Sequence, residues 1–448
     1  MEKLLVLNTK INAFVWGNWM IILLLCCGAL LFVMTKGLPF RKAGFIIKKT
    51  IGSLFHSQNS EGITSFQAVS TALAGTLGVG SIVGVATALT IGGPGALFWM
   101  CVSAILGMMT KYAEVVLAIH YRVRHHDGRW LGGPMTTLEY GCHCKFLGVL
   151  FAIFCMLASF GIGNLTPAQT ITETIQTYVE IPSIWIGIVL AFCMYLIVKG
   201  KAEGIMRWNE KFVPIISIIY IAACCFLIMR HKEQVYDVCI TILKSAFQFS
   251  SVLGAGSGYT IQKAMHYGIS RGVFSNEAGM GSSPLSHAAV EEVDAVEQGF
   301  WGIFEVFFDT LVVCVLSGFV ILTSNAYASG LDGVSLLVTC FEEGFGKAGG
   351  IVFALSLLFF AIPSILGWYY YALECLRYLF EVSFMVVIYQ IVFFGLLMIG
   401  GQLELRVVWE IADTLNGCMA IPNLISVVLL YKVVVKLTKE YLQQHGSD

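Results

Sequence analysis

Seven glycines and one proline lie inside the apolar stretch Thr71–Trp99, and four of the glycines are Gly75, Gly78, Gly80 and Gly84. A helix avoids glycine, because each one costs about 0.5–1 kcal/mol relative to alanine. Interrupting a helix in hydrocarbon is more unfavourable still, because each backbone group left without a hydrogen bond costs several kcal/mol. The interruption is tolerable where freed carbonyls coordinate a cation and freed N–H groups meet an anion. The stretch therefore predicts a site for a zwitterionic amino acid together with a sodium ion.

A second glycine-rich segment, GAGSG at 254–258, is centred on Gly256. Glycines in membrane helices also permit close helix packing, and the spacing of Gly80 and Gly84 fits that use. Two glycine-interrupted segments at matching positions of two halves, however, are typical of a transporter built from inverted repeats. We therefore expect both interruptions to border one binding site.

Asp309 and Glu305 lie one helical turn apart in an apolar segment. An ionisable group in a membrane span is a functional-site hypothesis when a partner lies near it. Lys111, Lys244 or a bound cation are the available partners. Two interpretations stay open: a structural ion pair, or a site that couples transport to sodium or to a proton.

Patterns of enzymes and metal sites are missing from the sequence. HExxH, GxSxG and paired catalytic carboxylates in one segment do not occur. Cys142–Cys144 and the pair His125 and His126 match no standard zinc spacing. The 14 cysteines are expected to be small buried hydrophobes. We expect a protein that is not an enzyme and has no cofactor.

The composition is that of an all-α polytopic membrane protein. Of 448 residues, 57% are hydrophobic and 12% are charged, whereas an ordinary soluble domain carries about 25% charged residues. The ten-residue alternating segments of a membrane β-barrel are missing, and the net charge of −1 does not indicate a nucleic-acid partner. Apolar windows predict about eleven membrane-spanning helices, at 15–34, 66–90, 96–121, 146–175, 184–198, 212–229, 238–265, 300–323, 349–376, 384–400 and 408–433.

Basic residues gather on one side of the predicted membrane. The loops that share a side with the C-terminus hold 19 of the 27 lysines and arginines. Because positive loops stay in the cytoplasm, the N-terminus is expected outside and the C-terminus inside. The chain then divides into an extra N-terminal helix with a basic linker (1–60), two inverted units (61–235 and 236–435) and a cytoplasmic tail (436–448).

Several motifs resemble the alanine or glycine:cation symporter family. They are the first glycine-rich segment through GGPGALFW, RGVFSNEAGMGSSP at 271–284, FFDTLVVC at 307–314 and SILGWYYY at 364–371. The string FSNEAGMGS is highly specific. The resemblance implies a leucine-transporter-type fold, with a 5+5 inverted repeat of ten core helices behind one additional N-terminal helix.

The resemblance also implies roles for particular residues. Sodium is expected to bind main-chain carbonyls of Gly75 and Gly78 together with the hydroxyl of Ser364. Trp368, one turn after Ser364, is expected to wall the substrate pocket. The residues expected at the substrate site are Gly75, Thr76, Gly78, Gly80, Ser81, Phe160, Gln169, Gly256 and Trp368.

The sequence departs from the family pattern in two places. The usual GTGNI reads GVGSI here, which puts Ser81 in the place of an asparagine. After FGIGN the family tends to have glutamine and then asparagine, where this chain has Pro167 and Gln169. Because both regions are expected to line the substrate site, the identity of the amino acid stays open.

The string FSNEAGMGSSP has the glycines of a phosphate loop but neither its lysine nor a preceding strand. We expect Ser275, Asn276 and Glu277 instead to cap and tie down a cytoplasmic segment that seals the inward path.

We therefore predict a multi-pass symporter of the plasma membrane (the inner membrane in a bacterium) that imports a small neutral amino acid, alanine-like or glycine-like, with sodium. Proton coupling through Asp309 or Glu305 is the alternative, and a channel or an intramembrane enzyme would be a different class. Sodium is a co-substrate rather than a cofactor, and membrane lipid is a partner. A monomer is compatible with the sequence, which specifies neither the oligomeric state nor the ion stoichiometry.

Overall fold

A computed structural model describes residues 2–55, 62–199, 202–248, 261–380, 383–403 and 405–445. Within these ranges, eight helical segments are long and apolar enough to cross a membrane, and two shorter apolar helices accompany them. The predicted all-helical membrane architecture is confirmed, whereas the predicted number of eleven spans is not. Strands β1 (Val123–Arg124) and β2 (Trp130–Leu131) form a small antiparallel hairpin in which Val123 pairs with Leu131.

The helices follow one another with short connections. In chain order they are α1 (Glu2–Val15), α2 (Asn18–Met34), α3 (Leu38–Arg41), α4 (Ala43–Lys49), η1 (Ile51–Phe55), α5 (Ser65–Thr76), α6 (Val79–Gly92), α7 (Gly95–His120), α8 (Pro134–Thr136), η2 (Thr137–Gly141), α9 (Lys145–Phe160), η3 (Gly161–Leu165), α10 (Thr166–Gln176), α11 (Ser183–Val198), α12 (Ala202–Arg230), α13 (Lys232–Ala246), α14 (Ile261–Asn276), α15 (Pro284–His287), α16 (Ala295–Val306), η4 (Phe307–Cys314), α17 (Val315–Thr323), η5 (Asn325–Ser329), α18 (Gly333–Phe345), α19 (Lys347–Leu379), α20 (Ser383–Gly400) and α21 (Leu405–His445).

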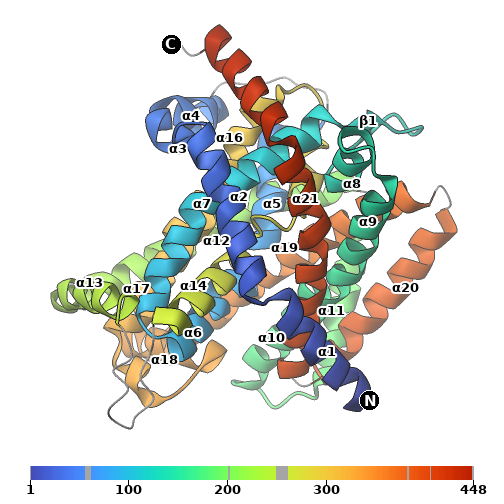
Figure 1. The fold of residues 1–448 in the computed structure, drawn as a ribbon. Coiled ribbons are helices and arrows are strands. Elements are labelled where there is room, and N and C mark those ends of the chain that lie inside the picture. The colour runs from blue at the N-terminus through green and yellow to red at the C-terminus, as the bar shows by residue number, and fades with distance from the viewer. Residues whose placement is uncertain are drawn as a thin grey trace.

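The two termini lie at opposite ends of the bundle, and α21 runs along most of its length (Figure 1). The first apolar segment starts earlier than predicted, at Val6, because α1 and α2 follow one another almost without a gap. The last helix also exceeds the predicted span, since α21 continues to His445 through most of the predicted tail. The hairpin β1–β2 lies at the same end as the C-terminus (Figure 1), which we call the C-terminal end.

The predicted interruption in the first glycine-rich segment is confirmed. α5 ends at Thr76, and α6 begins at Val79, so that Leu77 and Gly78 separate two helices. Gly78 has an extended backbone (φ −99°, ψ −152°), and its N–H donates to the carbonyl of Thr76 at 2.7 Å rather than to the carbonyl four residues back. The break leaves carbonyls at the end of α5 and N–H groups at the start of α6 outside the regular helical pattern.

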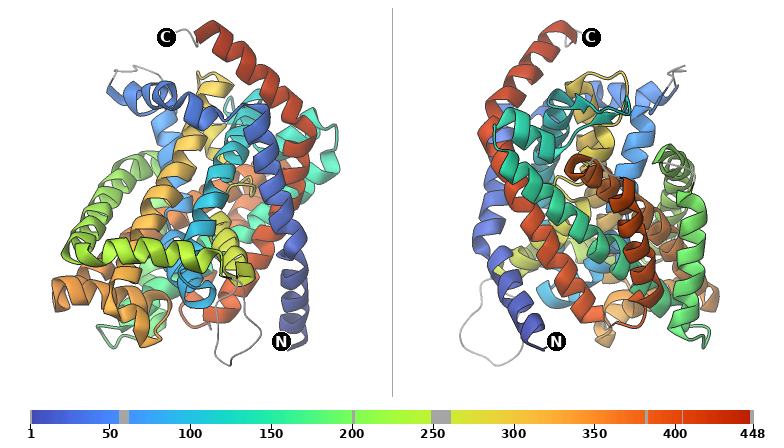
Figure 2. Two further views of the ribbon diagram at one scale, coloured as in Figure 1. Left: turned by 60° about the vertical axis from the view of Figure 1, so that its left-hand side comes forward. Right: turned by 90° about the vertical axis from the view of Figure 1, so that its right-hand side faces the viewer.

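The predicted span 238–265 is contradicted in its first part, because α13 ends at Ala246, while 249–260 lie outside the described residues. Its first part belongs to α13, which lies across the direction of the long helices (Figure 2, left view) and is not among the candidate spans. The physical reason is that α13 is short and carries charges at both ends, so that it buries only one apolar stripe, which includes Val238 and Ile242. The interruption predicted at 254–258, with Gly256, lies outside the described residues.

Two long helices widen to π-helical turns at η3 and η4. Such turns shift the side chains that follow by one position and are frequent at functional sites. η3 leads into α10 beside the break in α5–α6, and η4 contains Asp309. Both turns therefore lie where the sequence predicts chemistry.

Candidate functional site

A small cavity borders the break between α5 and α6. Side chains and backbone from α5, α6, η3, α10, α14 and α19 enclose it. Its volume of about 10 Å³ is enough for about one water molecule. The cavity must therefore widen before an amino acid enters it. Its lining residues are Gly75, Thr76, Gly78, Gly80, Ile162, Thr166, Pro167, Phe274 and Ser364.

One face of α19 packs directly against the backbone of the break, with no side chain between them. A methyl carbon added to Gly78 would lie 2.8 Å from Ser364 Oγ, and one added to Gly75 would lie 2.9 Å from Tyr371 Oη. One added to Gly367 would lie 3.2 Å from the backbone nitrogen of Gly75. The structure therefore brings together the three residues predicted for sodium, Gly75, Gly78 and Ser364, and glycine is what makes this approach possible.

Two buried polar atoms beside this region have no hydrogen-bond partner in the described part of the chain. They are Thr166 Oγ1, which lines the cavity, and Trp368 Nε1. An unpaired buried group costs about 1–3 kcal/mol, a cost that a bound ligand can remove. Trp368 stands against η3, where a methyl carbon added to Gly163 would lie 2.1 Å from its Cβ. Thr166 was not among the residues predicted from the sequence, in which its only signal is its place beside Pro167.

Ser81 of α6 satisfies a carbonyl at the end of α5 across the break. The hydroxyl of Thr76 donates back to the carbonyls of Ala72 and Leu73, at 3.3 and 3.4 Å, as threonine commonly does in membrane helices. The carbonyl of Thr76 accepts a hydrogen bond from Ser81 Oγ at 2.6 Å. The hydroxyl of Thr76 thus points to its own helix, while its carbonyl faces the break.

Asp309 lies fully buried in a cluster of hydroxyl groups. Its carboxylate contacts Ser81 Oγ at 2.5 Å, Ser275 Oγ at 2.7 Å and Thr310 Oγ1 at 2.8 Å. Ser275 Oγ also contacts Ser81 Oγ at 2.8 Å. With the contact between Ser81 and the carbonyl of Thr76, five short oxygen–oxygen contacts share three hydroxyl hydrogens. This cluster has fewer hydrogens than contacts.

Glu305 has basic partners, whereas no lysine, arginine or histidine within the described residues forms an ion pair with Asp309. Lys111 Nζ lies 3.2 Å from Glu305 Oε1, and His287 Nε2 lies 3.3 Å from Glu305 Oε2, with all three side chains fully buried. Gln298 Nε2 contacts the other ring nitrogen of His287 at 2.7 Å. Lys244, the other predicted partner, is exposed on α13. The geometry supports a structural ion pair for Glu305 and separates it from Asp309.

The residues predicted as a cytoplasmic gate are buried, and two of them contact η4. Ser275 belongs to the Asp309 cluster, and Asn276 Nδ2 donates to Thr310 Oγ1 at 3.0 Å. Glu277 has a positive φ of 54° and accepts a hydrogen bond from Ser282. All three predicted residues are buried, because the chain turns inward after α14 and packs its polar groups against η4. The side chains of Ser275 and Asn276 therefore connect α14 with η4, and the gate role stays a prediction.

The C-terminal end is closed by a set of ion pairs around Asp127, in the hairpin. Arg129 Nη2 lies 2.7 Å and Arg377 Nη2 lies 2.9 Å from the Asp127 carboxylate, so that the hairpin is tied to the end of α19. Partial burial raises the pKa of Asp127, but the hydrogen bonds from Arg129 and the charge of Arg377 hold it well below its usual range. Asp127 therefore stays ionised at neutral pH.

The hairpin is also tied to the loop before α16. Arg122 donates to the carbonyls of Ala288 and Glu291 at 3.1 Å, and Arg124 lies 2.9 Å from the Glu291 carboxylate. Both guanidinium groups stack on Trp130, at 4.1 and 4.2 Å from its ring. Burial lowers the pKa of Arg122 to about 10, although Glu291 opposes the shift. Sequence reasoning missed this closure; its signal was the dense charge of RVRHHDGRW.

Behind this closure lies a larger cavity of about 260 Å³. Acidic and basic groups line it in similar number, together with aromatic rings, and α5 and α19 reach both this cavity and the small one. Its lining residues are Gly62, Ile63, Gln67, Arg129, Trp130, Arg207, Ala289, Glu291, Tyr370, Glu374 and Arg377.

Two predicted substrate residues point elsewhere. The ring of Phe160 packs against Tyr389 and Phe393 of α20, at 5.2 and 6.4 Å between ring centres. Gln169, with its amide nitrogen facing α20, donates to the carbonyls of Gly400 and Gly401 at 3.3 and 3.2 Å. Neither residue lines the small cavity.

No group of three or more histidine, cysteine or acidic residues is arranged to hold a metal ion within the ranges that the structure describes. His125 Nδ1 instead lies 3.4 Å from Asp127, and the thiols of Cys142 and Cys144 are free.

Comparisons with known proteins agree with this picture. The model of the "Sodium:alanine symporter family" matches residues 1–448. The chain is 39% identical to the sodium/alanine symporter AgcS of Methanococcus maripaludis, over 98% of each chain, and 33% identical to the probable sodium/glutamine symporter GlnT of Bacillus subtilis, over 98% of this chain and 91% of that one. Among solved structures, a manganese transporter of Eremococcus coleocola has a similar fold (TM-score 0.53, 13% identity), over 80% of this chain and 75% of that one.

Proposed function

The chain belongs to the sodium:alanine symporter family, and we propose that it imports a small neutral amino acid together with sodium by alternating access. Members of this family are transporters and not enzymes, and sodium is their co-substrate. The observation that carries the proposal is the break at Leu77–Gly78, where a small cavity meets the hydroxyl of Ser364.

Sodium is proposed to bind where α19 meets the end of α5. Carbonyl groups near Gly75 and Gly78, freed by the break, and the Ser364 hydroxyl are hard oxygen donors close to one another. The negative end of the α5 dipole favours a cation at the same place. Binding of the ion would therefore hold α5 against α19.

The amino acid is proposed to lie beside the ion, across the break. The first N–H groups of α6, near Gly80, suit its carboxylate, because a helix N-terminus attracts anions. Thr166 and Trp368 offer unpaired polar atoms, and Phe274 adds an apolar wall. Phe160 and Gln169 remain proposed substrate residues from the sequence, although neither lines this cavity. Gly256 lies outside the described residues and remains a proposal from the sequence alone.

The coupling energy is sufficient for accumulation. One charge crossing 100 mV contributes about 2.3 kcal/mol, and a tenfold sodium gradient adds about 1.4 kcal/mol. One sodium ion per cycle therefore supports several-hundred-fold accumulation of a neutral solute.

Two inverted five-helix units, 61–235 and 236–435, behind one extra N-terminal helix are proposed as the scaffold. The broken pair α5–α6 at the start of the first unit supports this division, and α14 would take the corresponding place in the second. The excess of basic residues at the C-terminal end supports a cytoplasmic C-terminus in the plasma membrane. The ion pairs around Asp127 would then close the cytoplasmic path, and the 260 Å³ cavity would lie on that path.

Uptake of labelled alanine, glycine and serine into proteoliposomes tests the proposal. Each substrate is offered with an inward gradient of sodium, of lithium or of protons alone. Uptake that needs sodium and saturates with one of the three amino acids is expected. Flux that does not saturate would indicate a channel, and uptake equal under all three gradients would contradict sodium coupling.

A proton is the second candidate for the coupling ion, and the hydrogen count around Asp309 favours it. A proton on Asp309 Oδ1 would fill the 2.5 Å contact with Ser81 Oγ and free the hydrogen of Ser81 for the carbonyl of Thr76. Asp309→Asn distinguishes the two ions. If sodium alone drives transport, counterflow in the variant persists and still needs sodium. If the Asp309 proton is the coupled ion, wild-type uptake responds to a pH gradient without sodium, and the variant loses that response.

A further inference from the structure

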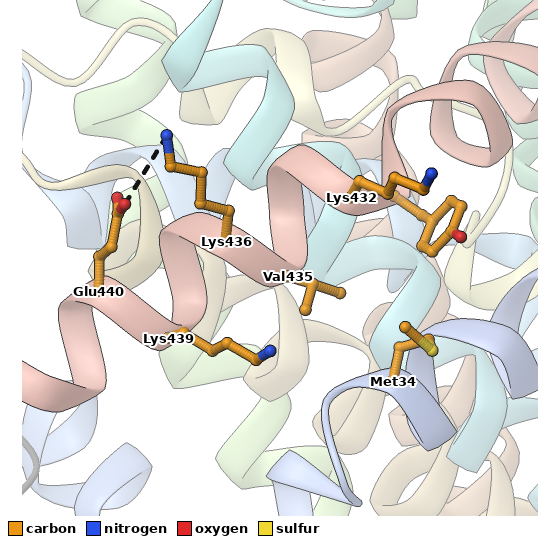
Figure 3. Close-up of a pocket in the computed structure, with 7 residues that line it drawn as sticks. Met34, Lys432, Val435, Lys436, Lys439 and Glu440 are labelled. Atoms are coloured by element: carbon orange, nitrogen blue, oxygen red, sulfur yellow. Dashed lines mark ion pairs between the residues drawn. The ribbon is translucent and has the colours of Figure 1, made fainter.

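A groove runs between the end of α2 and the last turns of α21, far from the break in α5–α6. Its volume is about 330 Å³, within the range of small-molecule sites. Figure 3 shows three lysine side chains of α21 together with Val435 and Met34, with Lys436 extended toward Glu440. The residues that line the groove are Met34, Tyr431, Lys432, Val435, Lys436, Lys439 and Glu440.

The groove is positively charged. Lys432, Lys436 and Lys439 follow one another at intervals of four and three residues, so they share one face of α21. Glu440 is the one acidic residue of the lining, 3.8 Å from Lys436, and both side chains are largely exposed. Lys432 and Lys439 form no ion pair with the described residues. An exposed pair such as Lys436–Glu440 contributes little, so the groove keeps an excess of positive charge.

The groove lies where the surface of both helices changes from apolar to basic. On α21, Leu429 is 63% exposed and is followed three residues later by Lys432. On α2, Val33 is 70% exposed and is followed by Met34 and then Lys36. Exposed aliphatic side chains belong in hydrocarbon, and lysines belong at the headgroup level. Both helices therefore cross the boundary between hydrocarbon and headgroups at the groove.

We propose that this groove binds the phosphate headgroup of an anionic glycerophospholipid of the adjacent leaflet. The phosphate meets the ammonium groups of Lys432, Lys436 and Lys439, while an acyl chain follows Met34 and Leu429 into the bilayer. Basic pockets between membrane helices are suited to such headgroups. The apolar side chains of Met34 and Val435 in the lining, and the position at the boundary, favour a lipid over free phosphate, because free phosphate has no apolar part to contact them. A lipid in this place would hold α21 against α2.

Native mass spectrometry of the full-length protein released from detergent micelles tests the proposal. Phosphatidylglycerol and phosphatidylcholine with identical acyl chains are titrated separately, and inorganic phosphate is added as a competitor. We expect phosphatidylglycerol to be retained, phosphatidylcholine not to be retained, and millimolar phosphate to leave the complex intact. Equal retention of both lipids would overturn the anionic preference, and displacement by phosphate alone would assign the groove to a soluble anion.

Matched variants locate the site. Each lysine near a membrane surface contributes about 1 kcal/mol, or about fivefold in affinity, so K432Q/K436Q/K439Q should weaken retention by roughly a hundredfold. K48Q/K199Q/K211Q removes the same charge from exposed lysines outside the groove and should leave retention unchanged. Equal losses in the two triple variants would refute a specific groove.

Single variants keep the test decisive where the triple variant unfolds. K439Q should weaken retention about fivefold, whereas Glu440→Gln, which removes the one carboxylate of the lining, should strengthen it. Changes in the same direction, or no change in either variant, would overturn the proposal.

Discussion

Gly78→Ala offers the sharpest test of the proposed sodium site. The new methyl carbon would lie 2.8 Å from Ser364 Oγ and 3.2 Å from Ser364 Cβ. The first distance is 0.6 Å shorter than the 3.4 Å at which ordinary contact begins. The extended backbone of Gly78 is open to alanine, so the change acts through this contact and not through backbone strain. The hydroxyl of Ser364 must move away from the break.

The size of the effect follows from the contact. Overpacking of this kind costs about 1–3 kcal/mol, and each 1.4 kcal/mol is about a tenfold change in affinity. If Ser364 Oγ and the carbonyls near Gly78 hold the ion together, the sodium concentration for half-maximal uptake should rise about 5- to 150-fold. The affinity for the amino acid measured at saturating sodium should change less, because the displaced hydroxyl belongs to the ion site.

The assay is uptake of labelled alanine into proteoliposomes over a series of sodium concentrations. Gly84→Ala, in the helix α6 that follows Gly78, is the matched control, because its methyl carbon would meet nothing within 4 Å. That variant should keep the wild-type sodium dependence and be slightly more stable, by about 0.5–1 kcal/mol. A folded Gly78→Ala protein with wild-type sodium dependence would refute the site at Ser364. An equal loss in both alanine variants would show a general weakness of α6 instead.

Outcomes are expected for substitutions at three further positions. Lys111→Met should lower the free energy of unfolding by about 3–5 kcal/mol, because it leaves Glu305 without its lysine, and the double variant with Glu305→Gln should recover most of the loss in a denaturant titration; no recovery would contradict the pairing. Asp127→Asn should speed labelling of a cysteine placed at Gln67 from the C-terminal end, since it frees the hairpin from α19. The pKa of Asp127 is lowered from 3.8, so its ion pairs are fully formed above pH 3.8 and are lost only when the pH falls through the lowered pKa. Asp127 therefore does not titrate between about pH 5 and 8. Asp127→Asn should leave the pH profile of uptake in that range unchanged. Gly163→Ala, whose methyl carbon would lie 2.1 Å from Trp368 Cβ, should abolish alanine binding in a scintillation proximity assay, whereas Gly395→Ala, with open space around it, should not.

Local properties of the chain were predictable from the sequence. Apolar windows and glycine spacing depend only on nearby residues, so the helices and the break before Val79 follow from the chain itself. Motifs such as FSNEAGMGS identified the family, and with it the pairing of Ser364 with the first broken helix. α13 was assigned wrongly, because an amphipathic helix beside an apolar segment cannot be told from a span by hydropathy alone.

The partners of buried polar groups were decided by the tertiary structure. Lys111 pairs with Glu305, and Asp309 receives hydroxyl groups from α6 and α14 beside that of its neighbour Thr310, because helices far apart in the sequence meet in the bundle. The π-turns at η3 and η4 set which side chains face the cavity, and periodicity alone does not reveal them. The sequence thus determined where the helix breaks between α5 and α6, because the glycines that permit the break are local to it. Which side chains contact the break depends on the packing of helices that are distant in the sequence.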